Sequence, residues 1–166
     1  MEIKPKEFDI ELIERTQQLI ENYSGDTEFT LLINCLLALV IIPSEYNKTE
    51  KLTFLNVLIT DIPIINDCIS KTEPYVFAPT HYDKKSQQHV NSDKTLGCFL
   101  KKIRNGIAHI SNCEPINDNG KWIGIKIKDI NTRNRNTELE ITLKYKEIKI
   151  ISKYISDEYQ REKLGL

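Results

Sequence analysis

The side chains best suited to chemistry lie in one ten-residue segment, KKIRNGIAHI, from Lys101 to Ile110. It holds a guanidinium at Arg104, an amide at Asn105 and an imidazole at His109. Arginine stays charged and can fork onto a phosphate. Histidine titrates near neutral pH, so it can accept or donate a proton there. This set of groups suits anion binding combined with general acid–base catalysis.

An amphipathic helix is predicted to carry this segment. Apolar residues recur at helical spacing over four turns, at Leu96, Phe99, Leu100, Ile103, Ile107 and Ile110. Ser92 or Asp93 can cap the start of that helix. On it, Arg104 and His109 would lie about 140° apart in azimuth and about 7.5 Å apart along the axis, while Asn105 and His109 would share a face. A single copy is a poor phosphate clamp, whereas two such helices side by side would form a basic cleft.

Three helices are predicted upstream of the motif. Phe8 to Tyr23 has amphipathic helical spacing. Phe29 to Ile42 is apolar nearly all round and is expected to stop at Pro43. Lys48 to Ile59 favours a third, weaker helix.

The chain after the motif changes to a period of two. Alternating apolar residues at 123–127 and 139–145 predict two strands, joined as a hairpin over 121–145 by the polar link 131–136. Helical spacing then returns in a closing helix with Ile148, Ile151, Ile155 and Tyr159. These patterns predict a mainly α fold: a helical bundle with an appended C-terminal β-hairpin and a closing helix.

The length and composition indicate one ordinary globular domain. With 166 residues we expect a single domain, 1–166, in which the proline-containing residues 61–92 form an irregular insertion with a short helix around 64–70. Lys and Arg number 23 against 24 Asp and Glu, a net charge of −1, so any nucleic-acid binding must be local. The four cysteines have neither metal nor disulfide spacing, and we predict no metal and no cofactor. The N-terminus lacks signal-peptide character and no apolar run is long enough to cross a membrane, so we expect a cytoplasmic protein.

At its motif the chain resembles the HEPN superfamily (higher eukaryote and prokaryote nucleotide-binding domains). Ribonuclease members carry Arg, a polar residue, a short spacer and His, which the segment Arg104 to His109 fits. The upstream LLINCLLALVIIPSEYN and the hairpin after the motif look like a bacterial branch of HEPN nucleases. One departure is Gly106, where family members more often have Ala.

The resemblance implies a homodimer that cuts RNA without a metal, at a site assembled from both subunits. The catalytic residues would then be Arg104, Asn105 and His109: arginine on the scissile phosphate, asparagine on the phosphate or the imidazole, and two histidines as acid and base. Either the long apolar helix at 29–42 or the motif helix can form the dimer seam, and we favour the motif helix, because a composite site needs both His-bearing faces to meet. Family members often act in toxin–antitoxin or phage-defence systems, which implies an antitoxin or regulatory partner.

Candidate RNA contacts outside the motif proper are Lys101 and Lys102 beside Arg104, and Arg133 and Arg135 in the hairpin link. Each of these pairs is also compatible with plain solvated surface. The aromatic residues of the insertion, including Tyr82, are compatible with either core cover or a substrate lid.

Two alternatives to a ribonuclease site stay open for the motif. His109 could be a surface histidine near a helix C-terminus, where the helix dipole favours a cation. Alternatively, the chain is a catalytically inactive dimeric module that binds RNA, a nucleotide or a partner protein. A binding module would shift RNA in a gel without shortening it.

Overall fold

The computed structural model describes residues 8–22, 28–47, 51–109 and 112–165. Its helices are α1 (Phe8–Asn22), α2 (Glu28–Tyr46), α3 (Pro63–Ser70), α4 (Leu96–Ala108) and α5 (Tyr145–Leu164), with 3-10 helices η2 (Thr53–Asn56) and η3 (Ile59–Asp61). Its strands are β1 (Tyr75–Phe77), β2 (Thr80–Asp83), β3 (Gln88–Asn91), β4 (Cys113–Asp118), β5 (Lys121–Ile130) and β6 (Thr137–Lys144). The chain forms two compact units: a helical unit of residues 1–54 and 145–166, and an α/β unit of residues 55–144.

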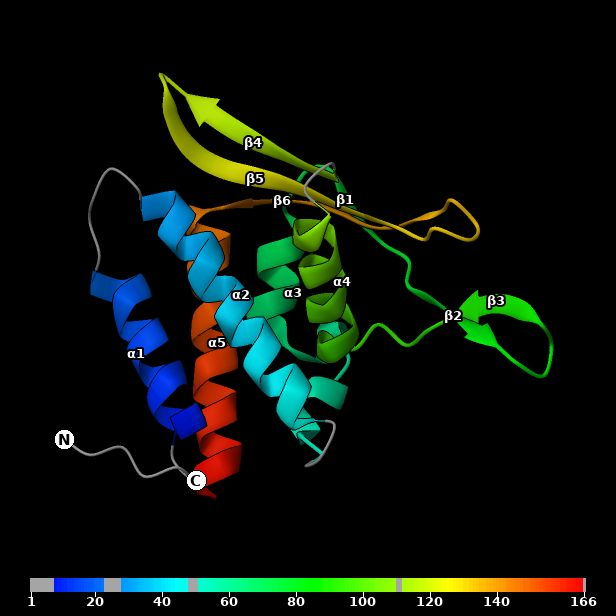
Figure 1. The fold of residues 1–166 in the computed structure, drawn as a ribbon, viewed down its shortest axis with the longest axis horizontal. Helices are drawn as coiled ribbons and strands as arrows, with labels where there is room; N and C mark the ends of the chain where they lie inside the picture. The colour runs from blue at the N-terminus through cyan, green and yellow to red at the C-terminus, as the bar shows by residue number, and fades with distance from the viewer. Residues whose placement is uncertain (1–7, 23–27, 48–50, 110–111, 166) are drawn as a thin grey trace. The chain divides into compact units, whose positions relative to one another are not determined.

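The helical unit packs α1, α2 and α5 against one another (Figure 1). The helices predicted at α1 and at the closing helix α5 are confirmed, and although Phe8 and Leu19 on α1 are exposed, each helix buries a stripe of apolar residues. These are Ile13 and Ile20 on α1 and Ile148, Ile151, Ile155 and Tyr159 on α5, all at most 1% exposed. Within this core the Tyr159 hydroxyl donates a 2.5 Å hydrogen bond to the carboxylate of Asp9, which is itself 3% exposed.

Helix α2 buries Leu32, Leu36, Leu39 and Val40, in line with its apolar composition, but it does not stop at Pro43. It continues to Tyr46, and the Pro43 carbonyl accepts a 2.9 Å hydrogen bond from the backbone N–H of Asn47. A proline in the last turn of a helix removes a single backbone donor. Here the Ser44 hydroxyl also donates to the Val40 carbonyl at 2.8 Å, which adds a side-chain hydrogen bond to this turn.

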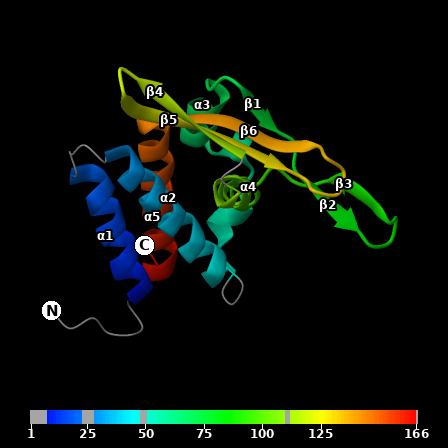
Figure 2. The same ribbon diagram turned by 45° about the horizontal axis from the view of Figure 1, so that its top comes forward.

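The α/β unit is built on an antiparallel four-stranded sheet with the order β1-β6-β5-β4. Strands β5 and β6 form the predicted hairpin, with Ile127 paired to Ile141 in the middle of the ladder. Figure 2 shows β1 lying along β6 at one edge and β4 along β5 at the other. A separate two-stranded ribbon, β2–β3, completes the strands of the unit.

The prediction of a mainly α fold is wrong: 55% of the described residues are helical and 25% are in strands, so the fold is mixed α/β. Residues 61–92, predicted as an irregular insertion, contain the expected short helix α3 but also β1, β2 and β3. The predicted helix at 48–59 is replaced, over its described part, by the short turns η2 and η3. The missed strands are short or polar, and β1 forms its ladder only with the distant strand β6, so no local periodicity marks it.

Candidate functional site

The motif lies at the C-terminal end of α4, the helix that packs on β5 and β6 in the α/β unit. The apolar stripe is confirmed over Leu96, Phe99, Leu100 and Ile103, which are at most 1% exposed. The helix is capped by Thr95, whose hydroxyl accepts from the Cys98 backbone N–H at 3.2 Å, rather than by Ser92 or Asp93. It ends at Ala108, and Ile110 lies outside the described residues.

His109 is the residue at which the backbone leaves the helix. Its φ and ψ are −98° and 78°, its N–H still donates to the Asn105 carbonyl at 3.1 Å, and its carbonyl accepts from the Asn112 N–H at 2.7 Å. The side chain is exposed. The azimuth predicted from an uninterrupted helix therefore does not apply to the imidazole, which is carried by a non-helical residue fixed by hydrogen bonds on both sides.

Arg104 and Asn105 are coupled directly. The Arg104 guanidinium is exposed and its Nη2 donates a 2.8 Å hydrogen bond to the Asn105 side-chain oxygen. The amide oxygen, predicted to hold a phosphate or the imidazole, thus orients the cation in this structure. Asn105 itself is half-buried.

Gly106 explains how α4 sits on the sheet. A Cβ atom at this position would lie 2.4 Å from Cγ2 of Ile127 and 2.8 Å from the carbonyl oxygen of Lys128. Only glycine therefore allows this approach of helix to strand. Because residues in a helix step by about 100°, Arg104 points away from the side that Gly106 presses on β5.

The two lysines before Arg104 have different surroundings. Lys101 is exposed, whereas the Lys102 side chain is only 12% exposed and ion-paired with two carboxylates. Its Nζ lies 3.1 Å from Oδ2 of Asp129 and also donates to Glu138. Burial alone would lower the pKa of Lys102, but the hydrogen bonds to Glu138 and Asp129 outweigh it and raise that pKa above its ordinary value.

Glu138 is the centre of this buried cluster and is 1% exposed. Besides Lys102 it accepts hydrogen bonds from the Thr80 hydroxyl and from Nδ2 of Asn131, the latter at 2.8 Å. Burial alone would raise the pKa of Glu138, yet these hydrogen bonds lower it below its ordinary value. We call Lys102, Asp129, Glu138, Thr80 and Asn131 the Glu138 cluster.

Arg133 and Arg135 are exposed in the turn that joins β5 to β6. The Asn131 side-chain oxygen accepts from the backbone N–H groups of Arg133 and Asn134, at 3.0 and 3.4 Å. The turn starts three residues after Lys128, whose carbonyl adjoins Gly106, so it begins within about 10 Å of that contact along the strand.

A protein-family model described as HEPN pEK499 p136 matches residues 1–164, nearly the whole chain. The chain belongs to this HEPN family. No curated protein matches it, and no solved structure does. The family match includes the motif and spans both the helical and the α/β unit.

In this HEPN chain every predicted site residue lies in the α/β unit. The structure brings Arg104 and Asn105 into contact and places His109 at the exposed end of the same helix. Lys102 is instead held inside the Glu138 cluster, so we leave it out of the proposed RNA contacts. Sequence reasoning missed that cluster, although Asp129 gave a signal: it continues the buried alternation of Ile125 and Ile127 with an acid, which needs a buried cation.

No group of three or more histidine, cysteine, aspartate or glutamate side chains that could hold a metal ion occurs among the described residues. Likewise, none of the helices that the structure describes combines the length and the apolar character that crossing a membrane needs.

Proposed function

We propose that this HEPN protein is a metal-independent endoribonuclease whose active site is completed by a second copy of the chain. The observation that carries the proposal is the end of α4, where an exposed imidazole follows an exposed guanidinium that Asn105 orients. An RNA phosphodiester needs both a charge partner and a proton-transfer group, and these residues supply them.

The reaction is an attack of the ribose 2′-oxygen on the adjacent phosphorus. His109 of one subunit accepts the 2′-OH proton while the new P–O2′ bond forms. His109 of the second subunit donates a proton to the 5′-oxygen as the P–O5′ bond breaks. The products are a 2′,3′-cyclic phosphate and a free 5′-OH, and Arg104 stabilises the extra negative charge on the phosphoryl oxygens in the transition state.

A second copy is required because one α4 end supplies a single imidazole, whereas the reaction uses an acid and a base at once. The direction in which α4 presents these groups supports the pairing: Gly106 presses on β5, and Arg104 points away from the sheet. Two α4 ends can therefore face each other without either leaving its own sheet.

Incubating the purified protein with RNA in EDTA tests the activity. Wild type should cut RNA and leave DNA intact, while His109→Ala and Arg104→Ala should lose at least about a hundredfold in rate. Arg15→Ala is a matched control, since Arg15 is an exposed arginine of α1 that pairs with Glu11. Equal cleavage by all four proteins would contradict the proposal, and a gel shift without shortening would favour the inactive binding module.

In the cell, we propose that this activity is restrained by an antitoxin or regulatory partner, as in a toxin–antitoxin or phage-defence system. Expression of wild type alone in bacteria should then arrest growth, and His109→Ala should relieve the arrest. Arrest that is equally strong with His109→Ala would separate toxicity from RNA cleavage and contradict this part of the proposal.

A further inference from the structure

An exposed aromatic platform lies on the β2–β3 ribbon of the α/β unit. Tyr82 of β2 is 43% exposed, and its ring packs edge to face on the His89 ring of β3, with centroids 5.5 Å apart. Arg133, from the β5–β6 turn, places its guanidinium carbon 5.5 Å from the centroid of the Tyr82 ring. A tyrosine ring and a guanidinium plane are thus held together at the surface by two segments far apart in sequence.

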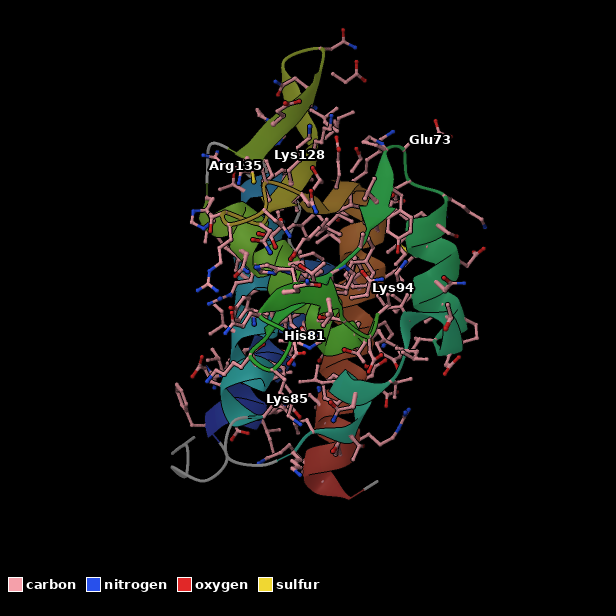
Figure 3. The ribbon with its side chains drawn as sticks, turned by 90° about the vertical axis from the view of Figure 1, so that its right-hand side faces the viewer. Glu73, His81, Lys85, Lys94, Lys128 and Arg135 are labelled. Atoms are coloured by element: carbon pink, nitrogen blue, oxygen red, sulfur yellow. The ribbon has the colours of Figure 1, made fainter. Side chains whose placement is uncertain are left out.

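The charge around this platform is opposite in sign to that of the chain as a whole. Residues 80–92 and 131–136 carry four basic side chains, Lys84, Lys85, Arg133 and Arg135, against one acidic side chain, Asp83, while the whole chain has a net charge of −1. The Asp83 carboxylate accepts from the backbone N–H groups of Lys85 and Ser86 at 3.0 and 3.1 Å, so it shapes the ribbon turn. Figure 3 looks onto this face, with His81 and Lys85 on the ribbon and Arg135 on the turn. The local excess of positive charge favours a polyanion.

The Glu138 cluster fixes the ribbon to the turn. Asn131, which begins the turn, bonds through Nδ2 to Glu138 at 2.8 Å and to the Thr80 hydroxyl at 3.3 Å. Thr80 begins β2 and also donates to Glu138. Since Lys102 of α4 binds the same carboxylate, the platform is tied to the motif helix by buried charged groups. A surface held in this way loses little conformational entropy when a ligand binds.

We propose that the β2–β3 ribbon and the β5–β6 turn form a binding site for single-stranded RNA, in which an unpaired base stacks on Tyr82 beside Arg133. The choice of RNA rests on the proposed nuclease function. Lys84, Lys85 and Arg135 contact the flanking phosphates. Stacking on an aromatic ring requires a base whose face is free, which a loop or single strand offers and a duplex does not. A merely acidic partner would use the lysines and have no need of an exposed ring next to a guanidinium.

The test compares two labelled oligomers of equal charge by fluorescence anisotropy. One is a short 2′-O-methyl oligouridylate, whose blocked 2′-oxygen prevents cleavage, and the other is an abasic strand of the same length. Wild type should bind the base-containing strand about tenfold more tightly than the abasic one. Tyr82→Ala should abolish that preference, Tyr82→Phe should keep it, and Arg133→Gln should reduce it while leaving the ring in place.

A matched control exists in the helical unit, where the Tyr145 ring also lies beside a cation, Lys149 Nζ, at 4.5 Å. Tyr145→Ala should leave the base preference intact. Equal affinity of wild type for both strands, or a preference that survives both Tyr82→Ala and Arg133→Gln, would overturn the site. Both strands resist cleavage, so this assay measures binding alone, and failure of the site is distinguished from failure of the proposed nuclease activity.

Discussion

The two units of this chain bury very different groups. The helical unit has a mainly aliphatic core, and the polar side chains that the structure shows buried there include no lysine or arginine: Asp9, which accepts from Tyr159, Thr16, Gln17, Ser152 and Ser156. The α/β unit buries an ammonium between two carboxylates, with Lys102, Asp129 and Glu138 exposed by 12%, 8% and 1%. A buried ion pair contributes little net stability compared with apolar packing, but removing one partner leaves an uncompensated buried charge. The unit that carries the motif is therefore the one that should be most sensitive to the loss of a single charged group.

The largest expected stability effect is the loss of Lys102. Lys102→Ala leaves two carboxylates facing each other in a buried site, which should lower the free energy of unfolding by about 3–5 kcal/mol. Lys101→Ala removes the neighbouring, exposed lysine and should change it by less than about 0.5 kcal/mol. Urea denaturation measures both values. If Lys102→Ala changed the free energy of unfolding as little as Lys101→Ala does, Lys102 would not be needed to compensate the two buried carboxylates.

The stability gap between wild type and Lys102→Ala should depend on pH in a defined way. The pKa of Glu138 is lowered in the folded protein, so its contribution is present above its ordinary value of 4.5 and is lost as pH falls through the folded value. The pKa of Lys102 is raised, so its contribution is present below 10.5 and is lost as pH rises through the folded value. The gap should shrink as the pH falls into the acid range, because protonation of Glu138 removes its bond to Lys102 in wild type and relieves the repulsion between the two carboxylates in Lys102→Ala. A gap undiminished in acid would contradict this assignment of charges.

The next largest effect on stability is expected at the packing contact between α4 and β5. Gly106→Ala places a methyl group 2.4 Å from the Ile127 side chain, which should cost about 1–3 kcal/mol. An alanine in an unrestricted helix interior would instead stabilise it by about 1 kcal/mol. Urea denaturation gives the change in the free energy of unfolding. A decrease would show that α4 packs closely on β5 at Gly106, and an increase would show that there is room for a methyl group. The proposed cleavage activity should fall with Gly106→Ala, because the displaced helix carries both Arg104 and His109.

The smallest effect is expected in the helical unit. Tyr159→Phe removes the donor to a buried aspartate and should cost about 1–2 kcal/mol. Tyr154→Phe, on the same helix, should change the free energy of unfolding by less than about 0.5 kcal/mol. RNA cleavage by Tyr159→Phe should stay at the wild-type rate at temperatures below its unfolding transition. A rate loss there comparable to that of Gly106→Ala would show that the two units do not divide stability and chemistry in this way.

Elements with a local apolar period could be predicted from the sequence, and elements without one could not. The helices α1, α4 and α5 follow from a 3.6-residue period, because each buries one apolar face. Strand β4 was not predicted; it contains Pro115, a residue that is rare inside strands, and it lies at a sheet edge, where proline is tolerated. The cap of α4 could not be assigned among neighbouring polar residues, since Thr95, Asp93 and Ser92 all suit an N-cap.

The candidate site was predictable in its residue types and only partly in its arrangement. Arg104, Asn105 and His109 stand out by chemistry and spacing. The departure of His109 from the helix, however, depends on a backbone hydrogen bond from Asn112. Similarly, Lys101 and Lys102 are adjacent and identical in sequence terms, and only the carboxylates of two later strands separate an exposed side chain from a buried one.

Mixed dimers give the most direct test of the composite site. Wild type and His109→Ala are co-refolded in equal amounts, so that subunits pair at random, and RNA cleavage is compared with wild type at the same total protein concentration. If each site needs both imidazoles, only dimers of two wild-type chains are active and about a quarter of the rate should remain. A remaining rate of about one half would mean that each subunit acts alone, and would contradict a site shared between two copies.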